Sequence, residues 1–551
     1  MGKHTCFTVN GKPFFSIGGQ LHNSSGYALG KVSGSKAIED AQKSFQTLKA
    51  IGANTVAVPV CWDAFEPIEG EFCTEYVKNI IDQVRAHDLH AILLWFGTWK
   101  NGQSEYAPVW IKKDRNRFPR VKCVDGSETA ALSPFYEQTK EMDKRAFVQL
   151  MKFIREYDEQ VQTVIAVQVE NEPGIFAPTI RDFSEMGTAT FHGQAATLAI
   201  QTARKDSGSL HKAWEQMGRK EMGSWTEVFG PFGAELCTAY AIASYVNEVA
   251  EAGKAEYDLF LYTNVWMDRE AKRGWSMAGL DYPSGGAVSK VLSLWRAATP
   301  ALDAISPDIY ETEPECIESV QQTYGNEHTF YVPESGITNV NASMMFQAVG
   351  TYGAIGYHVF GIERMLEEDG TISPFAEGIV RSFSMLTTAK DLLEQRLQVN
   401  ALVQHPGQDS QRLVFGDWLC RVSFAGASPE YAGWVAMDWR HEKELNGINQ
   451  VPMSIEDETA RGLLFQVCEN EYYLVGHKVR LFWQKMNWMD GAVPATMLNG
   501  QHQAYNMGLL LIEEGHFENG HFVTDRIRSG DEARHGIWAQ ADCGVVHFIL
   551  D

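Results

Sequence analysis

The sequence lacks several features that identify other classes of protein. Its nine cysteines contain no Cys-x-x-Cys pair, their number is odd and their spacing is wide. A disulfide framework or a zinc ribbon is therefore not expected, and reduced thiols in a cytosolic setting fit better. The zinc motif His-Glu-x-x-His is also absent, and the histidines form no recognisable metal-binding cluster. We expect no metal and no cofactor.

Long apolar segments are missing as well. No apolar run approaches the roughly 20 residues that a membrane-spanning helix needs. The N-terminal segment MGKHTCFTVNGKPFF lacks the apolar stretch of a signal peptide. We therefore expect a soluble, cytoplasmic protein, although a chain from which a signal had been removed would look the same.

Positive charge is scarce, whereas apolar and aromatic residues are plentiful. The chain has 47 Lys and Arg against 70 Asp and Glu, which gives a formal net charge of −23 at pH 7. A field of that sign repels nucleic acid and anionic membranes, so neither is an expected partner. Hydrophobic residues make up 44% of the chain, enough for a sizeable core, and 15 Trp and 19 Tyr are present. Flat aromatic rings pack in cores and also stack on sugar rings.

Strand-like and helix-like segments alternate up to about residue 390. Most strand candidates are continuous apolar runs, as expected for parallel strands that are buried on both faces. They lie at 14–19, 54–60, 90–96, 163–169, 259–265, 304–310, 329–335 and 355–361. Helical patterns lie between them, at 35–51, 74–87, 137–157, 188–218, 234–253, 286–300 and 343–353. This alternation predicts an α/β fold, a (β/α)8 TIM barrel over residues 1–395, with a long insertion at 188–255 after strand four.

The sequence pattern changes after residue 400. A helical stretch at about 373–398 is expected to close the barrel. Beyond it, strand-like runs are separated by turn residues, at 412–424, 432–439, 462–483, 507–525 and 544–550. We predict a C-terminal all-β sandwich domain over residues 400–551.

Two of the expected barrel strands end in carboxylates. Strand four ends in VQVENEPG (167–174) and strand seven in FYVPESG (330–336). Active sites of (β/α)8 barrels lie at the carboxyl ends of the strands, and strands four and seven lie nearly opposite each other. Glu172 and Glu334 are therefore expected to face one another, as the cleavage of a glycosidic bond requires. The alternative is that they cap helices or form ion pairs, and this alternative has more weight for Glu170.

Asn-Glu after strand four, together with Glu after strand seven, resembles the clan of (β/α)8 retaining glycosidases. Within that clan, VQVENE is similar to the family 35 β-galactosidases, and the segments at 18–25, 48–72 and 89–102 agree with it. The resemblance covers residues 10–175 well and continues more loosely to 390. The region after 400 is similar to the β-rich accessory domain of a bacterial subset. The sequence departs from the family pattern at Pro59–Trp62, Gly97–Asn101 and Pro173.

The resemblance implies roles for individual residues. Glu172 would be the acid/base and Glu334 the nucleophile, with carboxyl groups roughly 5–5.5 Å apart. Asn171 would bind the sugar 2-hydroxyl, and Tyr310 would donate a hydrogen bond to Glu334. Further candidates for sugar contacts are a strand-one histidine that matches the family, two tryptophans that directly follow strands, and a histidine in strand eight: His22, Trp99, Trp266 and His358. For the tryptophans and His358, and also for Tyr310, packing in the core is the alternative.

The resemblance implies a retaining exo-β-glycosidase, a β-galactosidase that releases terminal β-D-galactose from oligosaccharides or glycans. Two other hypotheses remain open. One is another β-glycosidase of the clan, such as a β-glucosidase or a β-mannosidase. The other is a carbohydrate-binding barrel without catalysis. The expected partner is a carbohydrate substrate, and a homo-oligomer is left open.

Overall fold

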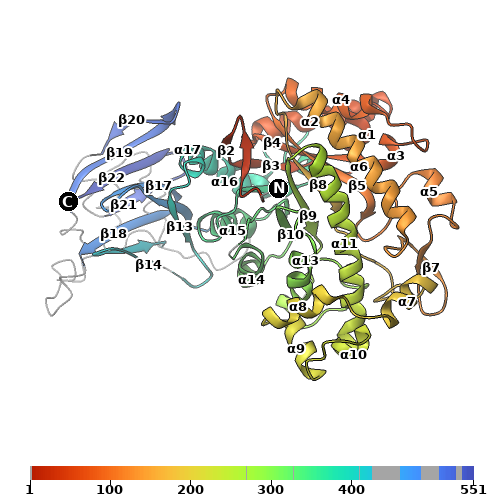
Figure 1. The fold of residues 1–551 in the computed structure, drawn as a ribbon. Helices are drawn as coiled ribbons and strands as arrows, with labels where there is room; N and C mark the ends of the chain where they lie inside the picture. Colours follow the sequence, from red (N-terminus) through yellow and green to blue (C-terminus); the bar gives the residue numbers. More distant parts are fainter. Residues whose placement is uncertain are drawn as a thin grey trace. The chain divides into compact units, whose positions relative to one another are not determined.

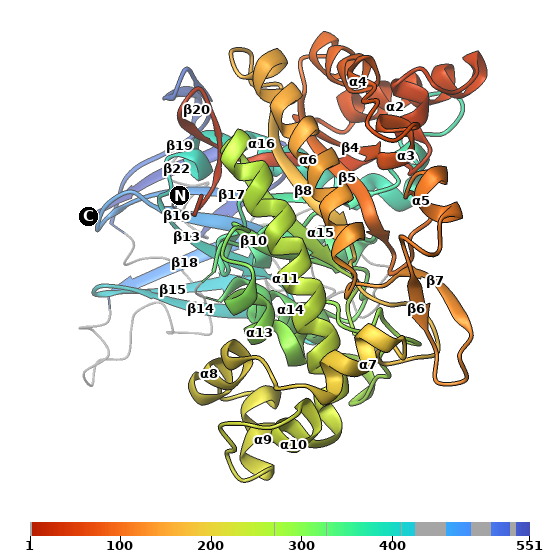
Figure 2. The same cartoon turned by 45° about the vertical axis from the view of Figure 1, so that its right-hand side comes forward.

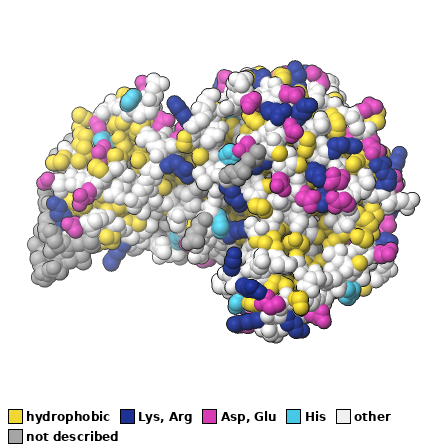
Figure 3. All heavy atoms as spheres, viewed as in Figure 1, with side chains coloured by type: hydrophobic (Ala, Val, Ile, Leu, Met, Phe, Trp, Pro, Cys, Tyr) yellow, Lys and Arg dark blue, Asp and Glu magenta, His cyan; other side chains and the backbone are white. Residues whose placement is uncertain are grey.

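The computed structural model describes residues 3–268, 270–326, 328–408, 410–424, 459–485, 508–528 and 536–551. The chain divides into two compact units. The first contains residues 1–310, 322–335 and 355–364, and the second contains residues 311–321, 336–354 and 365–551. Within the described residues, no helix has the length and apolarity needed to cross a membrane. On the face shown in Figure 3, acidic and basic side chains are interspersed.

An eight-stranded parallel sheet is the centre of the first unit (Figure 1). In chain order its strands are β3 (Ser16–Gln20), β4 (Thr55–Cys61), β5 (His90–Lys100), β8 (Val164–Asn171), β9 (Phe260–Val265), β10 (Ala304–Ile309), β11 (Glu334–Ser335) and β12 (Gly356–Phe360). Strand β12 pairs with β3, and a bridge between Val332 and Tyr357 joins the other edge of the sheet to β12. The sheet therefore closes on itself, and the predicted (β/α)8 barrel is confirmed.

Helices of the first unit alternate with these strands. They are α1 (Ser25–Leu29), α2 (Ser35–Ala50), α3 (Trp62–Phe65), α4 (Thr74–Ala86), α5 (Val109–Lys113), α6 (Glu137–Asp158), α7 (Glu185–His192), α8 (Thr197–Lys205), α9 (Ser209–Gln216), α10 (Trp225–Phe229), η1 (Gly230–Phe232), α11 (Gly233–Glu256), α12 (Glu270–Arg273), η2 (Ser289–Val291), α13 (Leu292–Ala298) and η3 (Ile362–Arg364). Helix α4 shows why they form, because its buried residues recur at helical spacing. Helices α6 and α11 lie side by side and pack on β5 and β8 (Figure 2).

The long segment after β8 is more divided than the sequence pattern predicts. The predicted helix 188–218 is three short helices, α7, α8 and α9, which are separated at Gly193 and Gly208. Two hairpins were also not predicted, β1 (Phe7–Val9) with β2 (Lys12–Phe14) and β6 (Arg120–Lys122) with β7 (Glu128–Leu132). In the first hairpin, Asn10 and Gly11 turn the chain with φ angles of 51° and 72°, which suits an Asn-Gly turn.

Two antiparallel sheets follow in the second unit. One has the order β13-β16-β17-β22-β19-β20 and the other the order β14-β15-β18-β21. The strands are β13 (Gln398–Val403), β14 (Ser410–Phe415), β15 (Trp418–Ser423), β16 (Arg461–Gln466), β17 (Glu471–His477), β18 (Val479–Lys485), β19 (Leu509–Glu518), β20 (His521–Ile527), β21 (Ile537–Ala539) and β22 (Val545–Leu550).

The two sheets share one apolar core. In it the ring of Trp483, from the four-stranded sheet, lies 4.6 Å from that of Tyr472 in the six-stranded sheet. This is the packing of the predicted β-rich C-terminal region. The predicted strand 432–439 lies outside the described residues. The second unit also contains α15 (Asn339–Gly350), η4 (Pro374–Ala376), α16 (Glu377–Thr388) and α17 (Lys390–Glu394), while α14 (Pro314–Gly325) is divided between the units.

Candidate active site

Side chains from the ends of four neighbouring barrel strands form one hydrogen-bonded group. The backbone N–H of Glu172, directly after β8, donates to Oδ1 of Asn264 in β9 at 2.8 Å. The Asn264 Nδ2 group donates to Oδ2 of Asp308 in β10 at 2.8 Å and lies 3.4 Å from Oε1 of Glu334 in β11. One amide side chain therefore connects the two glutamates that the sequence singles out.

Glu334 is surrounded by hydrogen-bond donors. The hydroxyl of Tyr310, directly after β10, donates to Glu334 Oε2 at 2.5 Å, and Asn264 approaches the other oxygen. Glu334 is 5% exposed, whereas the Tyr310 side chain is 48% exposed. Two neutral donors on a nearly buried carboxylate stabilise its anionic form. The arrangement suits a carboxylate that must act as a nucleophile.

Glu172 has the opposite electrostatic setting. Burial raises the pKa of Glu172 to about 7, with the Lys100 charge opposing this shift and the Glu334 charge adding to it. The side chain keeps an exposed fraction of 8%. The Glu172 carboxyl group is therefore able to hold a proton near neutral pH. The two glutamates thus differ in the way that a proton donor and a nucleophile must differ.

Asp308 is a third carboxyl group in this cluster. It lies beside Glu334, its register partner across the β10–β11 pair, and it is buried. Burial, followed by the Glu334 and Glu172 charges, raises the pKa of Asp308 well above its ordinary value. Sequence reasoning missed both Asp308 and Asn264. The signal that could have found Asp308 is that it is the single charged residue in the apolar run 304–310.

Glu170 does not share the site with Glu172. The backbone has positive φ angles at Glu170 (62°) and Glu172 (45°), so the regular alternation of a strand breaks here. The Glu170 carboxylate instead accepts hydrogen bonds from the backbone N–H groups of Trp99 at 2.6 Å and Thr98 at 3.2 Å. Asn171 is fully buried, and within the described part of the chain neither of its side-chain amide atoms has a hydrogen-bond partner.

The two predicted tryptophans lie in different surroundings. Trp266 is half-buried and stacks on Phe176, with ring centroids 4.8 Å apart. Trp99 is fully buried and packs edge-on against Tyr245 of α11 at 4.7 Å. Trp266 therefore keeps an accessible surface that a sugar could contact, and Trp99 does not.

The two predicted histidines also differ. His358 is fully buried, its Nε2 lies 2.8 Å from the hydroxyl of Ser16, and burial lowers its pKa to about 3. His22 is exposed, and its backbone N–H donates to Glu363 at 2.8 Å. His358 is thus an uncharged residue of the barrel interior in this structure, whereas His22 remains accessible.

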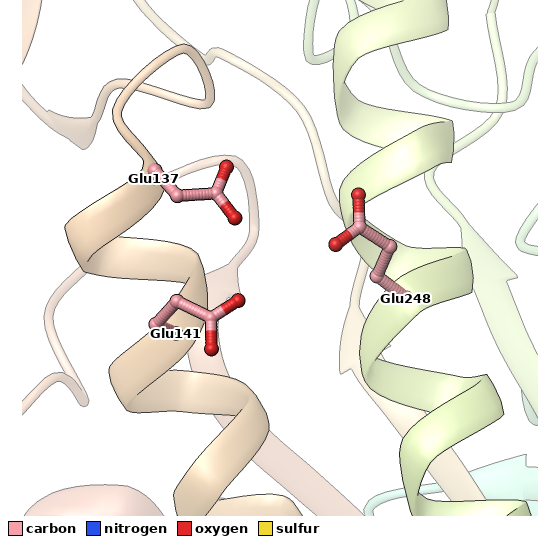
Figure 4. Close-up of side chains that lie close together, drawn as sticks. All are labelled: Glu137, Glu141 and Glu248. Carbon is pink, nitrogen blue, oxygen red and sulfur yellow. The ribbon is translucent and has the colours of Figure 1, made fainter.

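A separate group of carboxylates lies on α6 and α11 (Figure 4). Glu137 and Glu141 from α6 and Glu248 from α11 are, among the described residues, the one group with metal-binding proximity. Lysines lie between them, and Lys140 Nζ is 2.9 Å from Glu137 and 2.7 Å from Glu248. Lys144 pairs with Glu141. These lysines neutralise the carboxylates, so the group is an ion-pair network of two packed helices.

Comparison with known proteins identifies the barrel. Residues 35–235, which include the segment ending in Glu172, match the family model of glycoside hydrolase family 42, described as β-galactosidase. The matched part of the barrel is therefore similar to a glycoside hydrolase domain. Residues 379–540 match a domain of unknown function, DUF5597. No curated protein matches the chain.

Solved structures with similar folds include several glycosidases. A β-galactosidase from the psychrophilic Marinomonas ef1 is 14% identical, with 69% of this chain and 61% of that chain covered and a TM-score of 0.47. A catalytic mutant of a family 42 β-galactosidase from G. stearothermophilus is 15% identical, with 71% and 59% covered and a TM-score of 0.46. An exo-β-1,4-mannosidase from Opitutaceae bacterium strain TAV5 is 13% identical, with 71% and 63% covered and a TM-score of 0.43. This chain thus spans less than two thirds of these enzymes.

The family model corrects one prediction. Residues 35–235 of the barrel are similar to family 42 of the glycoside hydrolases, not to family 35. The motif VQVENE that suggested family 35 ends in the Asn-Glu pair that the whole clan of retaining (β/α)8 glycosidases has after strand four. Such residues report the chemistry of a barrel, and they do not distinguish one family from another that performs the same chemistry.

Proposed function

We propose that the glycoside hydrolase barrel is a retaining exo-β-galactosidase, with Glu334 as nucleophile and Glu172 as acid/base. The observation that carries this proposal is the electrostatic contrast between them. Glu334 accepts hydrogen bonds from Tyr310 and Asn264, whereas burial raises the pKa of Glu172 to about 7. A retaining glycosidase needs one ionised and one protonated carboxyl group at the start of the reaction.

The first half of the reaction follows from these protonation states. The Glu334 carboxylate attacks the anomeric carbon, while the glycosidic C–O bond breaks and Glu172 donates its proton to the leaving oxygen. The product is a glycosyl ester on Glu334. The ester carries no charge, so the Glu334 contribution to the raised pKa of Glu172 disappears.

The second half uses Glu172 as a base. It accepts a proton from water, the water oxygen bonds to the anomeric carbon, and the ester bond to Glu334 breaks. Two displacements at one carbon return the sugar with its original β configuration. Asn171 would hydrogen-bond the sugar 2-hydroxyl, and this role is supported by its position next to Glu172 and by an amide that has no hydrogen-bond partner within the described residues. Trp266 would offer its ring to a sugar face.

The choice of galactose rests on the description of the matching family model, β-galactosidase. This choice is tested by measuring turnover of an aryl β-galactoside, an aryl β-glucoside and an aryl β-mannoside. NMR identifies which anomer of the sugar is released first. We expect fastest turnover of the galactoside and initial release of the β-anomer. Faster turnover of another glycoside would show that the enzyme prefers that sugar to galactose. Initial release of the α-anomer would exclude double displacement. Tight sugar binding without turnover of any substrate would favour a non-catalytic barrel.

A further inference from the structure

Behind the candidate site, two fully buried carboxyl groups face each other. Glu170 comes from β8 and Asp143 from α6, and neither has any exposed surface. A Cβ atom on Gly97 would lie 2.7 Å from Glu170 Oε1 and 2.9 Å from Asp143 Oδ1. The backbone N–H of Thr98 lies within 3.3 Å of an oxygen of each group. The two carboxyl groups therefore border the same small volume.

The surroundings of this pair supply donors but no compensating cation. Asp143 accepts hydrogen bonds from Trp95 Nε1 at 2.9 Å and from the Tyr245 hydroxyl at 3.1 Å. Among the described residues, no Lys, Arg or His forms an ion pair with Asp143 or Glu170, and the main causes of the pKa shift of Glu170 include no cation. Two adjacent buried carboxylates cannot both remain ionised at moderate cost.

One shared proton resolves this conflict. Burial, and next the Asp143 charge, raises the pKa of Glu170 well above its ordinary value. Asp143, which accepts from Trp95 and Tyr245, is suited to remain the anion. The Glu170 carboxyl then donates its proton in a hydrogen bond to Asp143, and its other oxygen accepts from the Trp99 N–H at 2.6 Å.

The pair lies where the pairing of β5 with β8 is interrupted. The two strands pair as far as Trp95 and Val169 and meet again at Lys100 and Asn171, so four residues of β5 lie opposite Glu170 alone. The Glu170 side chain accepts from two backbone N–H groups of this bulge. Immediately afterwards, the carbonyl oxygens of Asn171 and Glu172 accept from Asn101 and Gly102 at 3.2 and 3.1 Å.

We propose that Glu170 and Asp143 form a proton-sharing carboxyl pair that holds the backbone around Glu170 and Glu172, both of which have positive φ angles, and so positions the acid/base. Both are positioning residues, since they lie outside the catalytic group. Non-glycine residues with positive φ persist only where the surrounding structure enforces them, and this pair supplies that enforcement. The inference rests on the proposed role of Glu172.

Because Glu170 donates the shared hydrogen bond and Asp143 accepts it, amide substitutions at the two positions should have different effects. Glu170→Gln keeps a donor toward Asp143 and an acceptor for Trp99, whereas Glu170→Leu has a similar size and neither. Asp143→Asn turns one acceptor into a donor that faces the donors of Trp95 or Tyr245. We expect Glu170→Gln to retain kcat/KM within about threefold. We expect Glu170→Leu and Asp143→Asn to lose at least tenfold on phenyl β-galactoside, as one lost hydrogen bond to a charged group implies.

A substrate with a good leaving group separates positioning from general damage. 2,4-Dinitrophenyl β-galactoside needs little proton donation, and kcat/KM reports the formation of the glycosyl ester. If the pair positions Glu172, the factor by which Asp143→Asn lowers kcat/KM should be at least threefold smaller on this substrate than on phenyl β-galactoside. Equal losses on both substrates, or a Glu170→Gln variant as impaired as Glu170→Leu, would overturn the proposal.

The shared proton has a second signature that does not depend on catalysis. Glu170 has a higher pKa in the folded than in the unfolded chain, so its contribution makes the free energy of unfolding fall as pH rises above its unfolded pKa. Gln cannot titrate. Between pH 5 and 8, the free energy of unfolding measured in urea should therefore fall more steeply with pH for the wild type than for Glu170→Gln. The same dependence on pH in both proteins would refute the shared proton. This unfolding experiment does not depend on activity. If the wild type cleaves no glycoside, only the proposed function is refuted. The experiment also remains possible if the Glu170→Leu or Asp143→Asn variant fails to fold.

Discussion

Glu172 and Glu334 owe their difference to the partners that the barrel gives them. The Glu334 carboxyl accepts hydrogen bonds from the Tyr310 hydroxyl and the Asn264 amide, whereas the Glu172 carboxyl has a hydrogen bond with the Asp308 carboxyl and its pKa is dominated by its burial. The Glu334 carboxylate is stabilised by neutral donors, and burial outweighs the other contacts of Glu172 and raises its pKa. At the scale of the residue, burial and hydrogen-bond partners together account for the contrast on which the proposed roles rest.

Removing either carboxyl group tests these roles. We expect Glu172→Gln and Glu334→Gln each to lose at least about a thousand-fold in rate on an aryl β-galactoside, since acid/base or covalent catalysis is lost. Glu137→Gln, in the ion-pair network of α6 and α11, is the matched control and should be close to wild type. A near-wild-type rate in either site variant would remove that residue from the mechanism.

The Tyr310 hydroxyl makes a separable contribution. Tyr310→Phe keeps the ring and removes the donor to Glu334. A hydrogen bond to a charged group contributes about 1.5–3 kcal/mol, so we expect kcat/KM to fall roughly 10–100-fold. Steady-state kinetics measure this loss, and thermal unfolding checks that the fold is intact. An unchanged kcat/KM would mean that the contact does not support the nucleophile.

The protonation of Glu172 predicts the alkaline side of the pH profile. Burial raises the pKa of Glu172 to about 7. The proposed acid must be protonated to act. The titration of Glu172 should therefore leave kcat/KM unchanged below about pH 7, and above this pH kcat/KM should fall, approaching a tenfold decrease for each pH unit. Initial rates measured from pH 5 to 9 locate the pH at which kcat/KM begins to fall, the alkaline limb of the profile. A limb near pH 4.5, the ordinary range of a glutamate, would contradict the burial argument.

At the scale of elements, the strands were more predictable than their connections. Continuous apolar runs such as 90–96 and 163–169 indicated buried parallel strands, and β5 and β8 lie there. The helical pattern over 188–218 was read as one helix but is three, because Gly193 and Gly208 interrupt it. The bulge of β5 opposite Glu170 depends on side-chain hydrogen bonds between distant segments, and a local pattern carries no trace of these.

The packing of α6 on α11 depends on one small residue. A Cβ atom on Gly253 of α11 would lie 2.2 Å from the ring of Phe147 in α6. Alanine favours a helix by about 1 kcal/mol over glycine, but overpacking costs about 1–3 kcal/mol or more. We expect Gly253→Ala to lower the free energy of unfolding, measured in urea. A stabilised variant would show that the two helices separate easily.

At the scale of the whole molecule, the barrel concentrates protonated acids in a chain with a net charge of −23. Burial raises the pKa values of Glu170, Glu172 and Asp308. Groups of this kind bind more protons in the folded than in the unfolded state, so each lowers stability as pH rises from its unfolded to its folded pKa. These buried carboxyl groups are therefore a source of instability at neutral and alkaline pH.

Glu172→Gln should consequently stabilise the protein. The shift from 4.5 to about 7 implies a gain on the order of 3 kcal/mol at pH 8 and little gain at pH 4. Urea unfolding of wild type and variant at both pH values measures the difference. A gain of equal size at both pH values would assign it to packing instead of to the lost charge.

Local pattern was sufficient for the broad architecture and for part of the site. Apolar runs, helical spacing and the polar residues after strands four and seven indicated the barrel, the β-rich C-terminal region, Glu172 and Glu334. These features repeat along the chain, so a sequence displays them directly. The same features did not separate family 42, whose model matches residues 35–235, from family 35, because residues that serve one chemistry do not by themselves distinguish families.

Only the closed barrel decided which polar residues meet. It brought Asn264 and Asp308 between the two glutamates, turned Glu170 toward Asp143, and enclosed Trp99 and His358. Each of these outcomes depends on contacts between segments far apart in the chain and on two left-handed backbone residues. Burial and its effect on proton binding arise from the environment that the folded chain creates, which no single segment contains.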